Sequence, residues 1–87
     1  MTRTLSLADM EVGCVGTVRE LVGRHAFIRR LEAMGIRRGT KLTKTSGAYL
    51  RGPVTVRAGN VQIALGYGIA SRVMIDVQLE DKGHHGA

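Results

Sequence analysis

The side chains best suited to bind a metal ion are three histidines and one cysteine, namely His25, His84, His85 and Cys14. Structural metal sites place such ligands at short spacings like C-x-x-C or H-x-x-x-H, and neither pattern occurs here. We therefore favour an exposed His25 at a helix start and a His84-His85 pair in a terminal tail over a native metal site. Weak binding of stray metal by the tail pair stays open, but we expect no cofactor.

Covalent catalysis requires a nucleophile near a base and an orienting acid. Cys14 fits a small apolar residue at the core better than a nucleophile. Asp9 and Glu11 are a candidate carboxylate pair, but we expect the segment that carries them to face solvent. The stretch at residues 66–68 (GYG) begins like a phosphate-binding loop, but Ser71 stands in place of the third glycine. The sequence therefore predicts that the protein is not an enzyme.

Arginines gather in the middle of the chain, whose formal net charge is +6. Such a cluster favours acidic proteins, nucleic acid or anionic lipid, although it could also be a solvated surface. Tyrosine and arginine are enriched at binding hot spots, although Tyr49 could equally fold over the core. The candidate partner-binding residues are Arg29, Arg30, Arg37, Arg38, Tyr49, Leu50 and Arg51.

The clearest structural element is a β-hairpin. Residues 53–58 and 61–65 are rich in β-branched side chains and flank Gly59-Asn60, a pair that suits a two-residue turn. A tight turn there places apolar residues opposite one another on one face. The expected facing pairs are Ala58 with Val61, Val56 with Ile63, and Val54 with Leu65.

Three further strands are expected over residues 14–21, 40–45 and 73–79, the last from its strict alternation of apolar and polar side chains. Lys41 and Lys44 suggest that the strand at 40–45 lies at an edge or is exposed. A helix is expected over 24–34, with Phe27, Ile28, Leu31 and Met34 turned inward and Gly35 ending it. Residues 66–72 fit a short helical turn.

These elements predict a mainly β fold, a small SH3-like barrel of about five strands with one inserted α-helix. We expect one domain over residues 1–80 and a flexible tail over 81–87. One cysteine cannot form an internal disulfide, no export signal is visible, and the longest apolar stretch is too short for a bilayer. The expected location is the cytoplasm.

Residues 30–39 (RLEAMGIRRG) resemble the signature of FeoA proteins, which accompany the bacterial ferrous-iron transporter FeoB. Further landmarks match at Leu7, Ala70 and residues 13–18, 52–54, 63–65 and 75–77. One departure is Arg38, where the family often has proline. The resemblance implies an SH3-like barrel that supports iron uptake from the cytoplasmic side of the plasma membrane.

The preferred function is therefore an accessory protein that binds the cytoplasmic part of FeoB. The alternative is a small basic barrel that binds nucleic acid without sequence specificity. Binders of single strands stack bases on several aromatic rings, whereas Phe27, Tyr49 and Tyr67 are few and scattered here. An enzyme is the third and weakest hypothesis.

Overall fold

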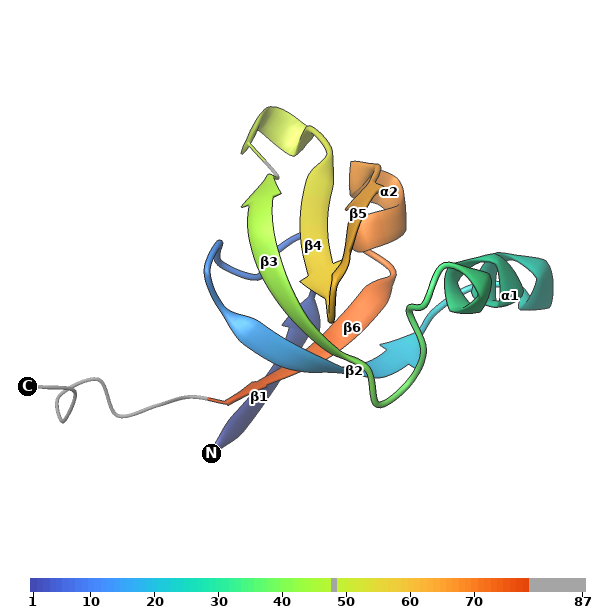
Figure 1. Ribbon diagram of the computed structural model, residues 1–87, viewed down its shortest axis with the longest axis horizontal. Coiled ribbons are helices and arrows are strands. Elements are labelled where there is room, and N and C mark those ends of the chain that lie inside the picture. The colour runs from blue at the N-terminus through green and yellow to red at the C-terminus, as the bar shows by residue number, and fades with distance from the viewer. Residues whose placement is uncertain (48, 79–87) are drawn as a thin grey trace, which may run out of the picture.

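A computed structural model describes residues 1–47 and 49–78 of the chain. These residues form one antiparallel sheet with short helical segments between its strands (Figure 1). In chain order the elements are β1 (Thr2–Ser6), β2 (Val15–Leu21), α1 (His25–Ala33), β3 (Lys41–Gly47), the 3₁₀ turn η1 (Tyr49–Arg51), β4 (Val54–Ala58), β5 (Val61–Leu65), α2 (Tyr67–Ala70) and β6 (Val73–Gln78).

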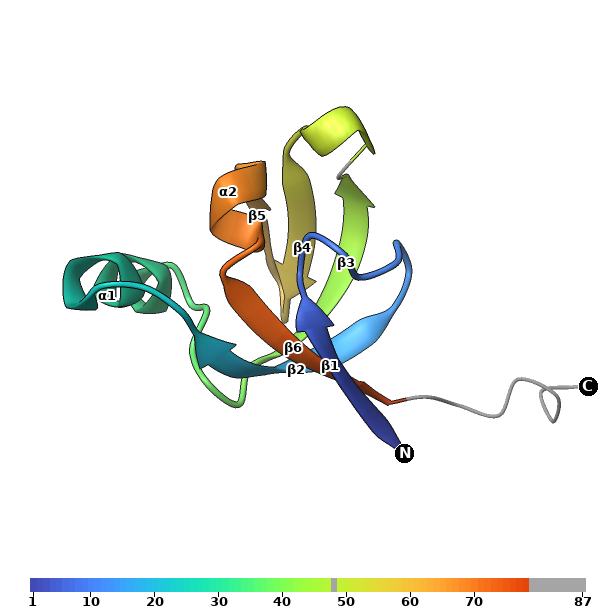
Figure 2. The ribbon, with the colours of Figure 1, turned by 180° about the vertical axis from the view of Figure 1, so that it is seen from behind.

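The sheet has six strands in the order β1-β6-β2-β3-β4-β5 and curls around its core (Figures 1 and 2). The mainly β architecture is confirmed, but with one strand more than expected. The additional strand, β1, pairs with β6 in the register Thr2 opposite Gln78 through Ser6 opposite Met74. Its polar sequence TRTLS has little of the apolar alternation that predicts a strand, so pairing with the far end of the chain defines it.

The predicted hairpin is confirmed in its full register. Val54 faces Leu65, Val56 faces Ile63, and Ala58 faces Val61 across β4 and β5. Gly59 adopts φ of 64°, the left-handed conformation that a two-residue hairpin connection needs. Turn chemistry and the apolar pattern therefore specify the same pairing. The strand expected over 73–79 is seen as Val73–Gln78, and residue 79 lies outside the described part of the chain.

The core is aliphatic, as a chain with no Trp and one Phe requires. Residues from both ends of the sequence contribute to it, because β1 pairs with β6 and the segment after β1 is hydrogen-bonded to β3. Leu31 from α1 belongs to this core, and Phe27 and Cys14 pack against it half-buried, as expected; Val77 does so too. The buried apolar residues are Leu7, Ala8, Met10, Val18, Leu21, Leu31, Ile36, Leu42, Val54, Val56, Ile63, Leu65, Ala70, Val73 and Ile75.

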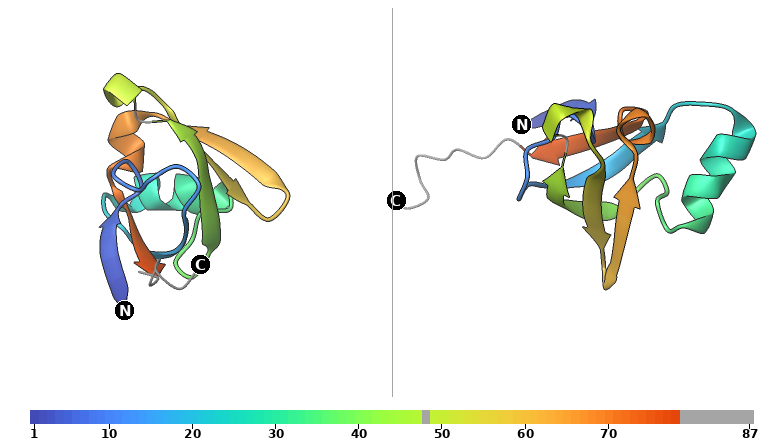
Figure 3. Two further views of the ribbon diagram at one scale, coloured as in Figure 1. Left: turned by 90° about the vertical axis from the view of Figure 1, so that its left-hand side faces the viewer. Right: turned by 90° about the horizontal axis from the view of Figure 1, so that it is seen from above.

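Helix α1 projects from one end of the barrel (Figures 1 and 3). Gly35 ends it with φ of 99°, and two backbone bonds complete the turn: Gly35 N–H to Glu32 O and Ile36 N–H to Leu31 O, both 3.0 Å. The buried pair Leu31 and Ile36 fixes this end to the core. Met34 is 43% exposed at the last position of a helix that projects from the barrel, so the expectation that it faces inward was wrong.

Lys44 corrects a second expectation. It was expected at an edge or on the surface, but β3 lies between β2 and β4, and Lys44 is only 1% exposed. Its ammonium Nζ donates to the backbone carbonyls of Leu7, Ala8 and Met10 at 3.1, 3.1 and 2.5 Å. The lysine therefore holds the turn after β1 against the inner face of β3. The three carbonyls in turn give the buried ammonium group the hydrogen-bond partners that it needs.

Candidate partner-binding surface

The four helix-side arginines of the candidate surface are all exposed. Arg29 and Arg30 lie on α1, whereas Arg37 and Arg38 lie in the turn that leads to β3. Within residues 1–47 and 49–78 the one ion pair joins Arg19 to Asp76 at 3.3 Å, on a different part of the sheet. The four guanidinium groups therefore present positive charge to solvent outside any described ion pair, although Glu32 on α1 partly offsets it. Such a charge attracts an acidic partner.

Helix α1 is also weakly capped at its beginning. Arg24 occupies the N-cap position without a side-chain hydrogen bond, and the first turn contains no acidic residue. Cations at a helix N-terminus oppose the helix dipole, and a nine-residue helix is marginal alone. The position of α1 therefore depends on the packing of Leu31 and Phe27 at the core and not on local helix stability.

The loop part of the candidate surface is the turn η1. Leu50 adopts φ of 54° and ψ of 37°, and Arg51 adopts φ of 62°. The left-handed region costs a residue with a side chain on the order of 1–2 kcal/mol, so two in succession are a strained backbone. Leu50 is 83% exposed at the tip of this turn. Tyr49 begins η1, but its side chain lies outside what the structure describes.

The structure separates the two parts that the sequence grouped together. Figures 1 and 2 show η1 at one end of the strands β3 and β4 and α1 beyond a different edge of the barrel, with α2 between them. The helix and the loop are therefore not direct neighbours. Between them lies α2, which is not part of the surface predicted from the sequence.

Two arginine–aromatic contacts connect these elements. The Arg51 guanidinium lies 5.8 Å from the ring centroid of Tyr67, at the start of α2. The Arg72 guanidinium, just after α2, lies 5.6 Å from the ring centroid of Phe27 in α1. Both distances are within the range of cation–π attraction. Neither contact has a signal in the sequence, because the partners are far apart along the chain.

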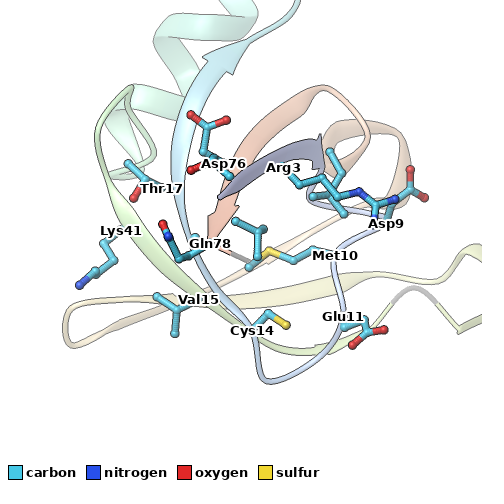
Figure 4. Close-up of a pocket in the computed structure, with 14 residues that line it drawn as sticks. Arg3, Asp9, Met10, Glu11, Cys14, Val15, Thr17, Lys41, Asp76 and Gln78 are labelled. Carbon is cyan, nitrogen blue, oxygen red and sulfur yellow. The ribbon is translucent and has the colours of Figure 1, made fainter. Parts of the chain in front are cut away.

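An open groove lies at the opposite end of the barrel, between the turn after β1 and the strands β1, β2 and β6 (Figure 4). The groove is lined by Asp9, Glu11, Cys14 and Asp76, among other residues. The Asp76 carboxylate accepts a 2.6 Å hydrogen bond from Thr4 Oγ1. Strand β2 separates Cys14 from His25, because these residues flank its two ends. His84 and His85 lie outside the described residues.

Of the candidate metal ligands that the structure describes, the groove contains Cys14 but not His25. In the described part of the chain, no three His, Cys, Asp or Glu side chains come together as a metal-binding group. The GYG stretch at 66–68 forms the start of α2, which is a four-residue helix and not a phosphate loop. Among the described helices, none has the length and apolar character needed to cross a membrane.

Comparison with known proteins identifies relatives of the whole fold. A model of the FeoA domain family matches residues 5–77, whereas no curated protein sequence matches the chain. The chain is 27% identical to an FeoA-like protein from Clostridium acetobutylicum, with a TM-score of 0.79 over 98% of this chain and 99% of that one. A crystal structure of an iron uptake regulatory protein (FeoA) is 29% identical, with a TM-score of 0.78 over 87% and 99% of the two chains.

A third similar structure is the FeoA of Stenotrophomonas maltophilia in complex with zinc, described as a prokaryotic SH3 domain protein. It is 25% identical, with a TM-score of 0.72 over 83% of this chain and 89% of that one. The SH3-like fold class is thereby confirmed. The FeoA family model matches residues 5–77 of the 87 residues, and the matches to the first two structures cover 99% of each of those chains. This chain therefore belongs to the FeoA family.

Proposed function

We propose that this chain is an accessory protein of ferrous iron uptake that binds the cytoplasmic part of an FeoB-type transporter. Membership of the FeoA family supports the link to iron transport. Small size and the exposed arginines of α1 and the following turn support a binding role. Such binding would hold the protein at the cytoplasmic face of the plasma membrane without inserting it.

The observation that carries this proposal is the exposed tip of η1. Leu50 is 83% exposed although its backbone is strained, with φ of 54°. A polar or glycine residue would suit both the exposure and the conformation better, so the leucine is costly for the isolated chain. Strain of this kind clusters at binding sites, and Arg51, which follows Leu50, is of a residue type enriched at interface hot spots.

The arginines of α1 and the following turn would act differently. Exposed charges contribute little to stability, but charge complementarity speeds the encounter with an acidic partner. Arg29, Arg30, Arg37 and Arg38 would therefore form a basic rim, whereas Tyr49, Leu50 and Arg51 would form an anchor. We expect rim charges to act through the association rate and the anchor through the dissociation rate.

This division predicts the effects of two substitutions on capture of the transporter's purified cytoplasmic domain. Leu50→Asn should raise Kd about tenfold by faster dissociation, because it removes the apolar anchor. Arg30→Glu should raise Kd by slower association, and the loss should shrink as salt is added. Surface plasmon resonance at two salt concentrations separates the two rates. Tyr49→Ala should behave like Leu50→Asn.

The matched control is Lys41→Glu, which reverses an exposed charge on β3 beside the groove. It should leave both rates close to those of the unaltered chain. Melting temperatures should also be unchanged, except that Leu50→Asn should melt slightly higher, because asparagine tolerates the left-handed region. Equal weakening by Lys41→Glu and Arg30→Glu would show a general effect of net charge and would contradict a defined surface.

The alternative partner, nucleic acid, is tested with the same variants. Binding to DNA or RNA should be weak, independent of sequence and steeply reduced by salt, because it would depend on phosphate contacts. Tight, sequence-selective binding at physiological salt would instead favour a nucleic-acid-binding function.

A further inference from the structure

Helix α2 lies between the loop and helix parts of the proposed surface and has one side available for contact. Its last residue, Ala70, is fully buried and fixes it to the core. Gly68, Ile69 and Ser71 face solvent, and Ile69 is the large apolar side chain among them, 36% exposed. Tyr67 is half-buried and packs against the core, with Arg51 over its ring. The exposed side of α2 thus continues the η1 surface.

The other end of α2 is joined to α1 through Phe27. A Cβ atom at Gly23 would lie 2.6 Å from Cδ2 of Phe27, so this ring rests directly on the Gly23 backbone. Arg72 lies over the ring, and its carbonyl accepts a 2.9 Å hydrogen bond from the N–H of Val22. Phe27 is therefore held between Gly23 and Arg72, which fixes the direction in which α1 projects from α2.

A surface made of η1 or α1 alone is small. Stable and specific interfaces bury about 800 Å² on each partner, contributed by about 20–30 residues. The three elements η1, α2 and α1 follow one another in space (Figure 3), so α2 extends either part toward the other. Their composition also fits, because interface centres combine apolar contacts with arginine and tyrosine. The residues along this line are Leu50, Arg51, Tyr67, Ile69, Arg72 and Phe27.

We propose that α2 is the centre of the docking surface, with Ile69 as its apolar contact and Arg51 and Arg72 as donors to carboxylates of an acidic protein partner. An arginine stacked on an aromatic ring keeps its N–H edge free and loses little further freedom when it binds a carboxylate. Two arginine donors held in fixed positions around the apolar Ile69 side chain fit the fixed carboxylates of a folded protein better than the fluid surface of a lipid bilayer. This inference rests on the proposed function and extends its surface.

The experiment compares Ile69→Ser and Arg72→Lys with the unaltered full chain in capture of the transporter's purified cytoplasmic domain. Ile69→Ser should raise Kd about tenfold, chiefly through faster dissociation. Arg72→Lys keeps the charge but not the planar, stacked group, so it should raise Kd several-fold while the salt dependence of binding stays the same. The matched control is Val61→Ser, which removes a 54% exposed apolar side chain at the far end of β5 and should leave Kd unchanged.

The outcomes separate this inference from the proposed function. Capture that is weakened by Leu50→Asn but unaffected by Ile69→Ser and Arg72→Lys would overturn the role of α2 and leave the function standing. No capture by the unaltered chain would overturn both. Vesicles of phosphatidylcholine with phosphatidylserine provide the second arm. If the α2 variants lost vesicle binding and kept protein capture, the partner of α2 would be lipid, and the inference of an acidic protein would be overturned.

Discussion

Replacement of Lys44 with alanine is expected to lower the free energy of unfolding by about 3–5 kcal/mol, a large share of the ~5–15 kcal/mol typical of small domains. The ammonium serves three buried carbonyls, those of Leu7, Ala8 and Met10. Alanine leaves these acceptors without their donor and opens a cavity where the lysine stem was. Urea unfolding followed by circular dichroism measures the change.

The matched control is Lys41→Ala on the same strand, where the side chain is exposed and the change should stay within about 0.5 kcal/mol. Lys44→Met keeps most of the stem and removes the charge. It should lie between the two, because its main loss is the three hydrogen bonds. A free energy of unfolding for Lys44→Ala equal to that of Lys41→Ala would contradict the buried role of this lysine.

The same residue predicts a pH dependence. Burial lowers the pKa of Lys44 from its ordinary value of 10.5, although the charge of Asp9 acts in the opposite direction. The unfolded chain then binds the proton more tightly than the folded one, so stability increases as pH rises from the lowered pKa toward 10.5. The free energy of unfolding of the unaltered chain, minus that of Lys44→Met, should therefore rise with pH in this window. A fall would mean that the hydrogen bonds raise the pKa instead.

Replacement of Val56 with aspartate is expected to abolish folding. Val56 is fully buried in β4, opposite Ile63 on one side and Lys44 on the other. A carboxylate there would be buried beside Ile63, and any pairing with the Lys44 ammonium would take that group from the carbonyls it serves. The penalty of more than about 4–5 kcal/mol is comparable to the whole stability of a small domain. Proton NMR should show collapsed chemical-shift dispersion, and Ile63→Asp should behave in the same way.

The control for Val56→Asp is Gln62→Asp. Gln62 adjoins Ile63 on β5, but its side chain is exposed on the other face of the hairpin. It should fold and melt nearly as the unaltered chain does, so an effect of the added negative charge alone is excluded. Cooperative melting of Val56→Asp at the unaltered temperature would show that the register of the hairpin is wrong.

The hairpin was predictable because its information is local. Gly59-Asn60 and the β-branched residues around it specify both turn and register within a few positions. The end of α1 was predictable for the same reason, since Gly35 follows the apolar stripe directly. The overall class followed from such local signals together with the resemblance of residues 30–39 to FeoA proteins.

The features that were missed depend on contacts between distant parts of the chain. Strand β1 is defined by its ladder with β6, and the polar sequence of β1 gives no hint of that partner. Lys44 carries a side chain that is usually exposed, and only the three carbonyls of the turn after β1 explain its burial. The contacts of Arg51 with Tyr67 and of Arg72 with Phe27 also have no local signal, because each joins residues that are far apart in the chain.

The central claim is that this FeoA-family chain binds the cytoplasmic part of an FeoB-type transporter. Isothermal titration of the purified cytoplasmic domain with the full chain, with and without guanine nucleotide, tests it most directly. We predict saturable binding at a defined stoichiometry in at least one nucleotide state, with Leu50→Asn weakening it and Lys41→Glu leaving it unchanged. Absence of heat and of complex formation in every nucleotide state, at the highest concentrations that both proteins tolerate, would contradict the claim.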